Sequence, residues 1–206
     1  SEMCIRDRCS ILIRNNTSVK EINRRLFKMK QVETTREAII NRRSVRKYKT
    51  DMIPRDIIER IVEAGTYAAN GRGHQASIIL AVTNKELRDR LSEMNRKIGG
   101  WDEGFDPFYG APVVLVVLAE KDWPTHVYDG SLVMGNLMLA AHTEGIGSCW
   151  IHRAKEEFES EEGKQILSDL GVTGEYEGIG HCILGYPDEE IEEAKPRKDD
   201  YVFWVE

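Results

Sequence analysis

Three arginines and a serine lie within five residues near the start of the chain, at Arg42–Arg46. Arg binds phosphate oxygens through paired, charge-assisted hydrogen bonds, and a Ser hydroxyl adds a neutral donor. The side chains of Arg42, Arg43, Ser44 and Arg46 are therefore suited to a phosphomonoester dianion. The alternative is a solvated basic helix end, where cations are favoured by the helix dipole.

A loop of small and polar residues, AANGRGHQ, follows at Ala68–Gln75. Its two glycines allow the backbone to approach a ligand closely or to adopt positive φ. Asn70 and Gln75 can form hydrogen bonds with an amide-like edge of a ring. The loop is thus a candidate ligand contact, and an ordinary polar loop is the alternative.

Two later segments could contribute to the same site. In Gly147–Ile151 (GSCWI), small residues keep the backbone thin enough for a flat ring to lie against it, and Trp150 is a natural apolar wall. A tight turn with a core tryptophan is the alternative. Near the end, Lys195 and Arg197 are further cations that could reach the phosphate, unless they belong to a solvated tail.

Other common catalytic patterns are missing from the sequence. Its five histidines show no metal-ligand spacing with the carboxylates. There is neither a Ser-His-Asp order nor a Gly-x-Ser-x-Gly elbow, so hydrolysis has no support. We therefore name no catalytic side chain and no metal site.

Helices and strands are expected to alternate from Thr34 onward. Apolar spacing and capping residues predict helices at 34–43, 54–69, from 85, at 129–144 and at 160–170. Apolar, β-branched runs predict strands at 77–83, 112–119, 147–151 and 178–186. The run 112–119 is apolar at nearly every position, as in a strand buried on both faces. The expected fold class is α+β, in one domain.

The composition is that of an ordinary globular protein: of 206 residues, 41% are hydrophobic and 31% charged. The net charge of −6 disfavours nucleic acid as a partner. None of the four cysteines forms a Cys-x-x-Cys pair, which favours reduced thiols. No apolar run has the length needed to cross a bilayer. We expect a cytoplasmic protein.

The segment 1–28 differs from the rest of the chain. It carries seven Lys/Arg and only three Asp/Glu, and it has no apolar core of signal-peptide length. A transit peptide is one interpretation. Its opening, SEMCIRDR, also resembles translated sequencing-adapter sequence. We therefore expect 1–28 to be a tail without function, and 29–206 to be one domain that begins near Met29.

The order and spacing of these segments resemble the nitroreductase family of FMN-dependent oxidoreductases. The resemblance covers residues 30–206. It rests on RRSVRKY from Arg42, DPFYGAP from Asp106, YDGSLVMGNL from Tyr128, GSCWIHRA from Gly147, and the late Lys195-Pro-Arg.

This resemblance implies a central, mostly antiparallel sheet flanked by helices, an intertwined homodimer, and two FMN sites at the subunit interface. It assigns the FMN phosphate and ribityl chain to the cluster of Arg42, Arg43, Ser44 and Arg46, with help from Lys195 and Arg197. It assigns contacts from the partner subunit to a loop containing Ala69, Asn70, Gly71 and Gln75. It places the backbone of Trp150, Ile151 and His152 beside the flavin ring.

The same resemblance implies a ping-pong cycle, in which NAD(P)H gives a hydride to FMN and a small electron-poor acceptor such as a nitroaromatic or quinone then takes its place. The loop Gly99–Gly110 is the candidate lid. Where many members have Pro-Ser and Pro-Trp, this chain has Ala69-Asn70 and Ala76-Ser77, so substrate preference does not transfer. A flavin-binding redox sensor, a relative acting on flavin or halogenated aromatics, and a protein binding another phosphate remain alternatives.

Overall fold

A four-stranded sheet with the order β1-β2-β4-β3 is the centre of the structure, a computed structural model that describes residues 35–206. The tail 1–28 and the expected start at Met29 lie outside the described residues. The first described helix is α3 (Thr35–Asn41). Residues Ala38–Glu206 form one compact unit, to which the description below applies.

All three strand pairings in this sheet are antiparallel, as predicted. The strands are β1 (Ser77–Val82), β2 (Val113–Glu120), β3 (Gly147–Ile151) and β4 (Tyr176–Gly185). β2 and β4 form the middle of the sheet, and β3 lies at one edge. β3 contains Trp150, so the segment predicted to face a ligand lies at the edge of the sheet.

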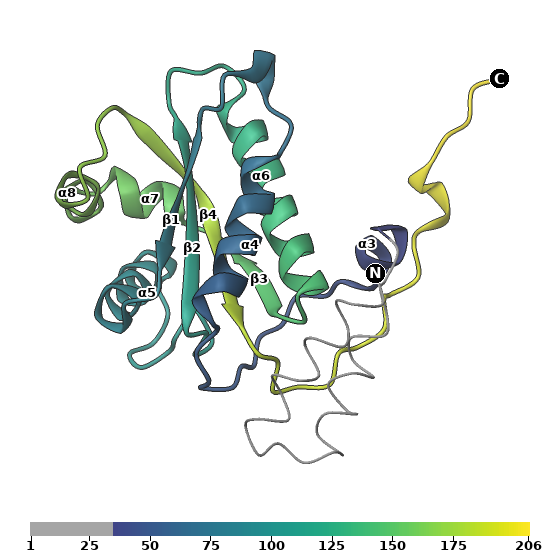
Figure 1. Ribbon diagram of the computed structural model, residues 1–206, viewed down its shortest axis with the longest axis horizontal. Helices are drawn as coiled ribbons and strands as arrows, with labels where there is room; N and C mark the ends of the chain where they lie inside the picture. Colours follow the sequence, from purple (N-terminus) through teal and green to yellow (C-terminus); the bar gives the residue numbers. More distant parts are fainter. Residues whose placement is uncertain (1–34) are drawn as a thin grey trace, which may run out of the picture. The chain divides into compact units, whose positions relative to one another are not determined.

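Helices cover both faces of the sheet (Figure 1). One face packs against α4 (Arg55–Thr66) and α6 (His126–Thr143). The other packs against α5 (Lys85–Gly99), α7 (Ala154–Glu159) and α8 (Glu161–Asp169). Successive strand residues point to opposite faces, so alternate residues of β2 enter two separate apolar clusters.

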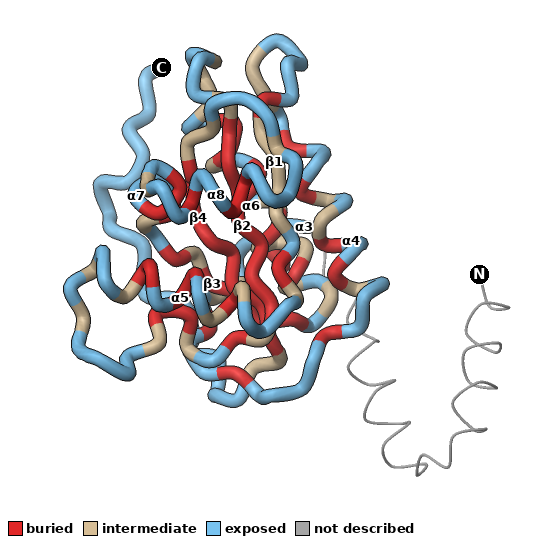
Figure 2. Tube along the Cα trace, turned by 90° about the vertical axis from the view of Figure 1, so that its left-hand side faces the viewer, coloured by how far each residue is buried: buried red, intermediate tan, exposed pale blue. Residues whose placement is uncertain are grey.

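The prediction that 112–119 is a strand buried on both faces is confirmed. Every residue from Val113 to Ala119 has no exposed surface, and Figure 2 shows this stretch within the buried centre of the sheet. Burying these branched side chains on both sides contributes about 1.5–3 kcal/mol each through the hydrophobic effect. β2 is therefore the strand around which both clusters form.

The bounds of the predicted helices agree with the structure to within three residues, and α6 starts at His126 rather than Asp129. The Asn84 side chain accepts a hydrogen bond of 2.9 Å from the Leu87 N–H, which starts α5 where it was expected. The second helix stops at Thr66 rather than Ala69, because Tyr67 and Ala68 N–H bond to carbonyls three residues back. The short helix α7 was not predicted at all.

Candidate functional site

The arginine-serine segment runs along the outer edge of β3. Ser44 forms a parallel bridge with Ser148, and the Val45 N–H donates to the Ser148 carbonyl over 3.0 Å. Residues about 100 positions apart in the sequence are thereby joined. The pairing brings the predicted phosphate ligands alongside the strand that carries Trp150.

Tyr48 fixes this segment in place. Its hydroxyl donates to the Val45 carbonyl over 2.6 Å, and its ring is buried. Burial raises the pKa of Tyr48, so the phenol stays protonated and keeps its hydrogen bond. The Lys49 N–H adds a bond of 2.9 Å to the Tyr186 carbonyl just after β4. The backbone that presents Ser44 and Arg46 is therefore anchored on both sides.

A pocket of about 1050 Å³ brings the early and late cations together. Its walls are Ile39 and Ile40 of α3, the segment 42–46 without Val45, and the C-terminal segment 189–197. Every cation predicted to hold the phosphate lines this pocket: Arg42, Arg43, Arg46, Lys195 and Arg197. Ser44 lines it as well.

The donors in this pocket are not equally available. Arg42 Nη1 is buried without a hydrogen-bond partner among the described residues, a costly state that an anion would relieve. Arg43 Nε is likewise buried without a partner among the described residues, but Arg43 Nη1 donates to the carbonyls of Ile40 and Arg42, at 2.7 and 2.6 Å. Arg197 likewise donates to the Lys195 carbonyl. The pocket thus offers unpartnered N–H groups to a phosphate from both Arg42 and Arg43, while Arg43 Nη1 also holds the end of α3.

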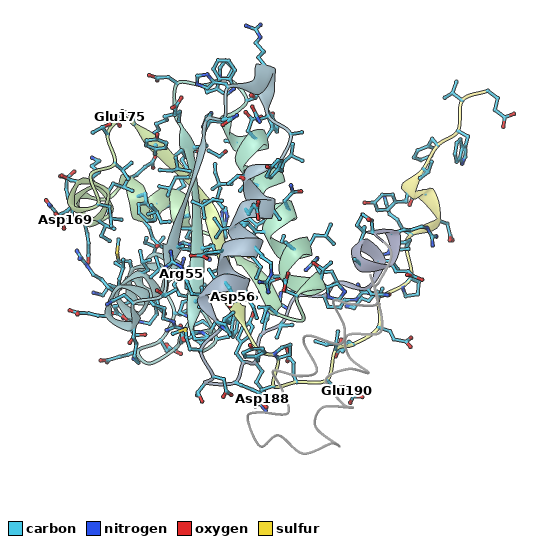
Figure 3. All side chains as sticks on the ribbon, viewed as in Figure 1. Arg55, Asp56, Asp169, Glu175, Asp188 and Glu190 are labelled. Atoms are coloured by element: carbon cyan, nitrogen blue, oxygen red, sulfur yellow. The ribbon has the colours of Figure 1, made fainter. Side chains whose placement is uncertain are left out.

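Four carboxylates also line this pocket: Glu189, Glu190, Glu192 and Glu193. Glu189 Oε1 accepts the Arg46 N–H over 2.6 Å; outside the pocket lining, Asp188 lies 3.6 Å from Lys47. Figure 3 labels Asp188 and Glu190 on the chain that leaves β4. Glu189 thus holds the backbone of Arg46, a residue that lines the pocket.

The loop of Ala69, Asn70, Gly71 and Gln75 is held in one conformation by its own side chains and by α6. Asn70 Oδ1 accepts the Gln75 N–H over 3.0 Å. The Gly71 N–H lies 3.1 Å from both oxygens of the buried Asp129. A Cβ on Gly71 would lie 2.4 Å from Thr125 Oγ1, so any larger residue here would have to displace the Thr125 side chain.

Asn70 and Gln75 line a second, smaller pocket of about 310 Å³, between α4, β1 and α6. No residue is shared between the linings of the two pockets. Within the described part of one chain, the loop residues and the phosphate cluster therefore do not line a common pocket.

The end of β3 presents the predicted ring-facing segment. The Trp150 side chain lies over Gly180 of β4, where an added Cβ would be 2.3 Å from Trp150 Nε1. Trp150 is half-buried, Ile151 is buried and His152 is exposed. The neighbouring Ser148 Oγ is buried without a partner among the described residues. The sequence analysis did not single out the Ser148 hydroxyl. The available signal was a small residue, serine, in a strand at the edge of the sheet.

The candidate lid Gly99–Gly110 is anchored at both ends. Near its start, the Trp101 carbonyl accepts from Arg96 over 2.7 Å, and the Arg153 guanidinium lies 4.5 Å from the Trp101 ring. At its end, Asp106 accepts from Phe108 N–H, Gly110 N–H, Ser92 and Arg88. These contacts hold both ends of the loop, and its movement as a lid stays a prediction.

No group of three or more His, Cys, Asp or Glu in residues 35–206 is arranged to hold a metal ion. Over the same residues, no helix combines the length and apolar character that a membrane crossing needs.

The class of protein that has this fold and site is identified by a match between the sequence and a protein-family model. The chain belongs to the nitroreductase family, whose model matches residues 39–99 and 100–190.

Individual relatives agree with this class. A nitroreductase with bound FMN from Bacteroides fragilis is 29% identical with a TM-score of 0.75, over 85% of this chain and 100% of that one. An FMN-dependent nitroreductase from Clostridium difficile is 29% identical with a TM-score of 0.66, over 82% and 98%. A Methanothermobacter thermautotrophicus protein named NADH dehydrogenase/NAD(P)H nitroreductase is 29% identical over 55% of this chain. That match spans 58% of the relative's own length.

Proposed function

We propose that this protein is an FMN-dependent oxidoreductase that takes a hydride from NAD(P)H and reduces a small electron-poor acceptor in a ping-pong cycle. The observation that carries the proposal is the single pocket in which Arg42, Ser44 and Arg46 meet Lys195 and Arg197. The family, and relatives named for FMN and NAD(P)H, support the same activity.

The phosphate of FMN would be held at the edge of β3. Arg42 offers a buried, unpartnered N–H, and the Ser44 and Arg46 side chains line the same pocket. Lys195 and Arg197 would close over the phosphate from the C-terminal segment. Charge-assisted bonds of this kind contribute about 1.5–3 kcal/mol each, which is enough to retain a cofactor without a covalent link.

When bound, FMN supplies the hydride chemistry, and the protein binds and orients it. Trp150, Ile151 and His152 would place an apolar side chain and backbone amides beside the ring. Ala69, Asn70, Gly71 and Gln75 would reach the ring of a second subunit. A side-chain acid or base is not needed, so the chain's contribution is binding, orientation and exclusion of water.

Trp150 provides a spectroscopic test of this placement. If its segment flanks the flavin, Trp150 fluorescence will be quenched in the holoprotein and will recover when flavin is removed. Replacing Trp150 with Ala should open space for water and oxygen. The peroxide formed per NAD(P)H consumed should then rise at full flavin occupancy. An unchanged peroxide yield in the folded variant would mean that the strand is not at the flavin edge.

We also propose that the protein is a homodimer. The apolar helix α6 leaves Tyr128 72% and Leu132 50% exposed, and near the C-terminus Phe203 and Trp204 are more than 80% exposed. Apolar surface of this kind indicates an interaction site. Within one chain, the Asn70 loop and the phosphate cluster line different pockets. In a dimer, the loop would instead reach the flavin held by the partner subunit. We expect a dimer mass in light scattering at micromolar concentration; a monomer with FMN still bound would refute the dimer.

The visible absorption spectrum of the purified protein tests the proposed cofactor. An oxidised flavin spectrum, released on denaturation as FMN, supports the proposal, whereas a colourless protein that cannot be loaded with FMN contradicts it. Bleaching by NAD(P)H then separates an enzyme from a flavin-binding sensor. A panel of nitroaromatic, quinone and halogenated aromatic acceptors, scored by the return of the oxidised spectrum, identifies the acceptor class.

A further inference from the structure

Three polar side chains without any exposed surface lie together behind the end of β3. They are Asn95 of α5, Glu157 of α7 and His181 of β4. Glu157 Oε2 lies 3.0 Å from His181 Nε2, and Glu157 Oε1 accepts from Asn95 Nδ2. Burying polar groups costs free energy unless they are paired, and apolar side chains of similar volume often stabilise a core as well or better. Stability alone therefore does not explain this network.

The network ends on the backbone of the segment predicted to face the ring. Asn95 Nδ2 also donates to the His152 carbonyl over 2.8 Å. Since both neighbours of this amide are acceptors, its NH₂ group must face them, which fixes the orientation of Asn95. A continuous chain of contacts thus runs from His181 through Glu157 and Asn95 to the peptide between His152 and Arg153.

That peptide is held in an unusual conformation. Arg153 has a φ of 80°, a region that residues other than glycine rarely adopt. Its carbonyl accepts the Glu157 N–H over 3.1 Å, and its guanidinium lies over Trp101. Strain of this kind persists where the surroundings impose it, and it is concentrated at functional sites. Here Asn95, Glu157 and Trp101 impose it together.

The position of the His152 carbonyl determines where the adjoining N–H points. The described chain has no cis peptide, so the C=O of His152 and the N–H of Arg153 lie on opposite sides of the peptide. With the carbonyl bound to Asn95 in the interior, the Arg153 N–H is directed away from α5. The network therefore sets the direction of one backbone donor at the end of β3.

We infer that Asn95, held by Glu157 and His181, is a positioning residue that aims the Arg153 N–H at the flavin ring. This inference rests on the proposed function. A backbone donor fixed toward the ring stabilises the negative charge that a flavin gains on reduction. Asn95 would thereby raise the midpoint potential of bound FMN without touching it.

The test compares wild-type holoprotein with Asn95→Ala, in which the His152 carbonyl loses its partner. Asn136→Ala is the matched control, because it removes an amide bond of 3.1 Å to the Ala64 carbonyl, on the other face of the sheet. Hydrogen exchange followed by mass spectrometry should show faster exchange around Arg153 in Asn95→Ala alone. At full FMN occupancy, the midpoint potential of Asn95→Ala should fall, while that of Asn136→Ala stays at the wild-type value.

An Asn95→Ala holoprotein with the wild-type potential would overturn the inference and leave Asn95 a structural residue. If Asn95→Ala does not fold, Asn95→Leu fills a similar volume without the amide. Hydrogen exchange around Arg153 and the midpoint potential are then measured in Asn95→Leu, with the same expected results. A wild-type protein that binds no FMN would instead overturn the proposed function itself, and the positioning of the flavin with it.

Discussion

Replacing both Arg42 and Arg46 with Ala should remove FMN from the protein during gel filtration. Each guanidinium is expected to contribute about 1.5–3 kcal/mol, the range for a hydrogen bond to a charged group. That range corresponds to roughly 10- to 150-fold in the dissociation constant for each single variant. The reason is structural: both side chains line the pocket beside Ser44, and Arg42 Nη1 has no other partner in the described residues.

Arg55→Ala is the matched control for this prediction. Arg55 lies at the start of α4, where Figure 3 labels it, and it forms an exposed ion pair with Glu59 four residues on. Exposed pairs of this spacing contribute about 0.3–0.5 kcal/mol. Flavin occupancy should therefore match the wild type in Arg55→Ala. A double variant of Arg42 and Arg46 that keeps its flavin through gel filtration would show that the phosphate binds elsewhere.

Asp106→Asn should lower the free energy of unfolding by about 2–4 kcal/mol at neutral pH. The Asp106 carboxylate accepts from Arg88, whose guanidinium is largely buried, and from Ser92 over 2.6 Å. Asparagine keeps the shape but leaves the charge of Arg88 with less compensation, even though Asp89 and the Ala111 carbonyl also accept from it. Chemical denaturation measures the difference.

The stabilisation by Asp106 should also depend on pH in a defined direction. Burial alone would raise the pKa of Asp106, but the hydrogen bonds from Arg88 and Ser92 outweigh it and hold the pKa below its usual value. The stabilisation is therefore complete above the unfolded-state pKa of about 3.9 and is lost as the pH falls through the lower folded-state pKa. The wild type should then approach Asp106→Asn in acid.

Asp102→Asn is the control for the pH experiment, since Asp102 lies in the same loop but is exposed. It should leave both the stability and its pH dependence close to those of the wild type. A gap between wild type and Asp106→Asn that stays constant from neutral pH to acid would contradict the proposed charge pairing.

Local sequence signals predicted the elements of this fold well. The cap at Asn84 and the doubly buried run of β2 depend on neighbouring residues and on composition, so they could be read from the sequence. The six-residue helix α7 could not. It is too short for a periodic pattern, and it starts from the positive φ of Arg153 that contacts from other elements impose.

The candidate site was predictable in its residue types but not in its supports. The spacing of Arg42, Ser44 and Arg46 predicted a phosphate cluster, and the structure gathers these residues in one pocket. The anchors were not predictable, because the bond from Gly71 to Asp129 and the bridge from Ser44 to Ser148 join residues far apart in the sequence. Such contacts follow from the packing of the sheet, which no local pattern encodes.

Anaerobic titration of the FMN-loaded protein with NADH and with NADPH tests the central claim most directly. The proposed activity predicts that the visible flavin absorbance disappears after about one molecule of the preferred donor per flavin, since one hydride carries both electrons. The absorbance should then return when an acceptor is added without oxygen. A fully loaded protein whose spectrum neither donor changes would contradict the assignment as an NAD(P)H oxidoreductase.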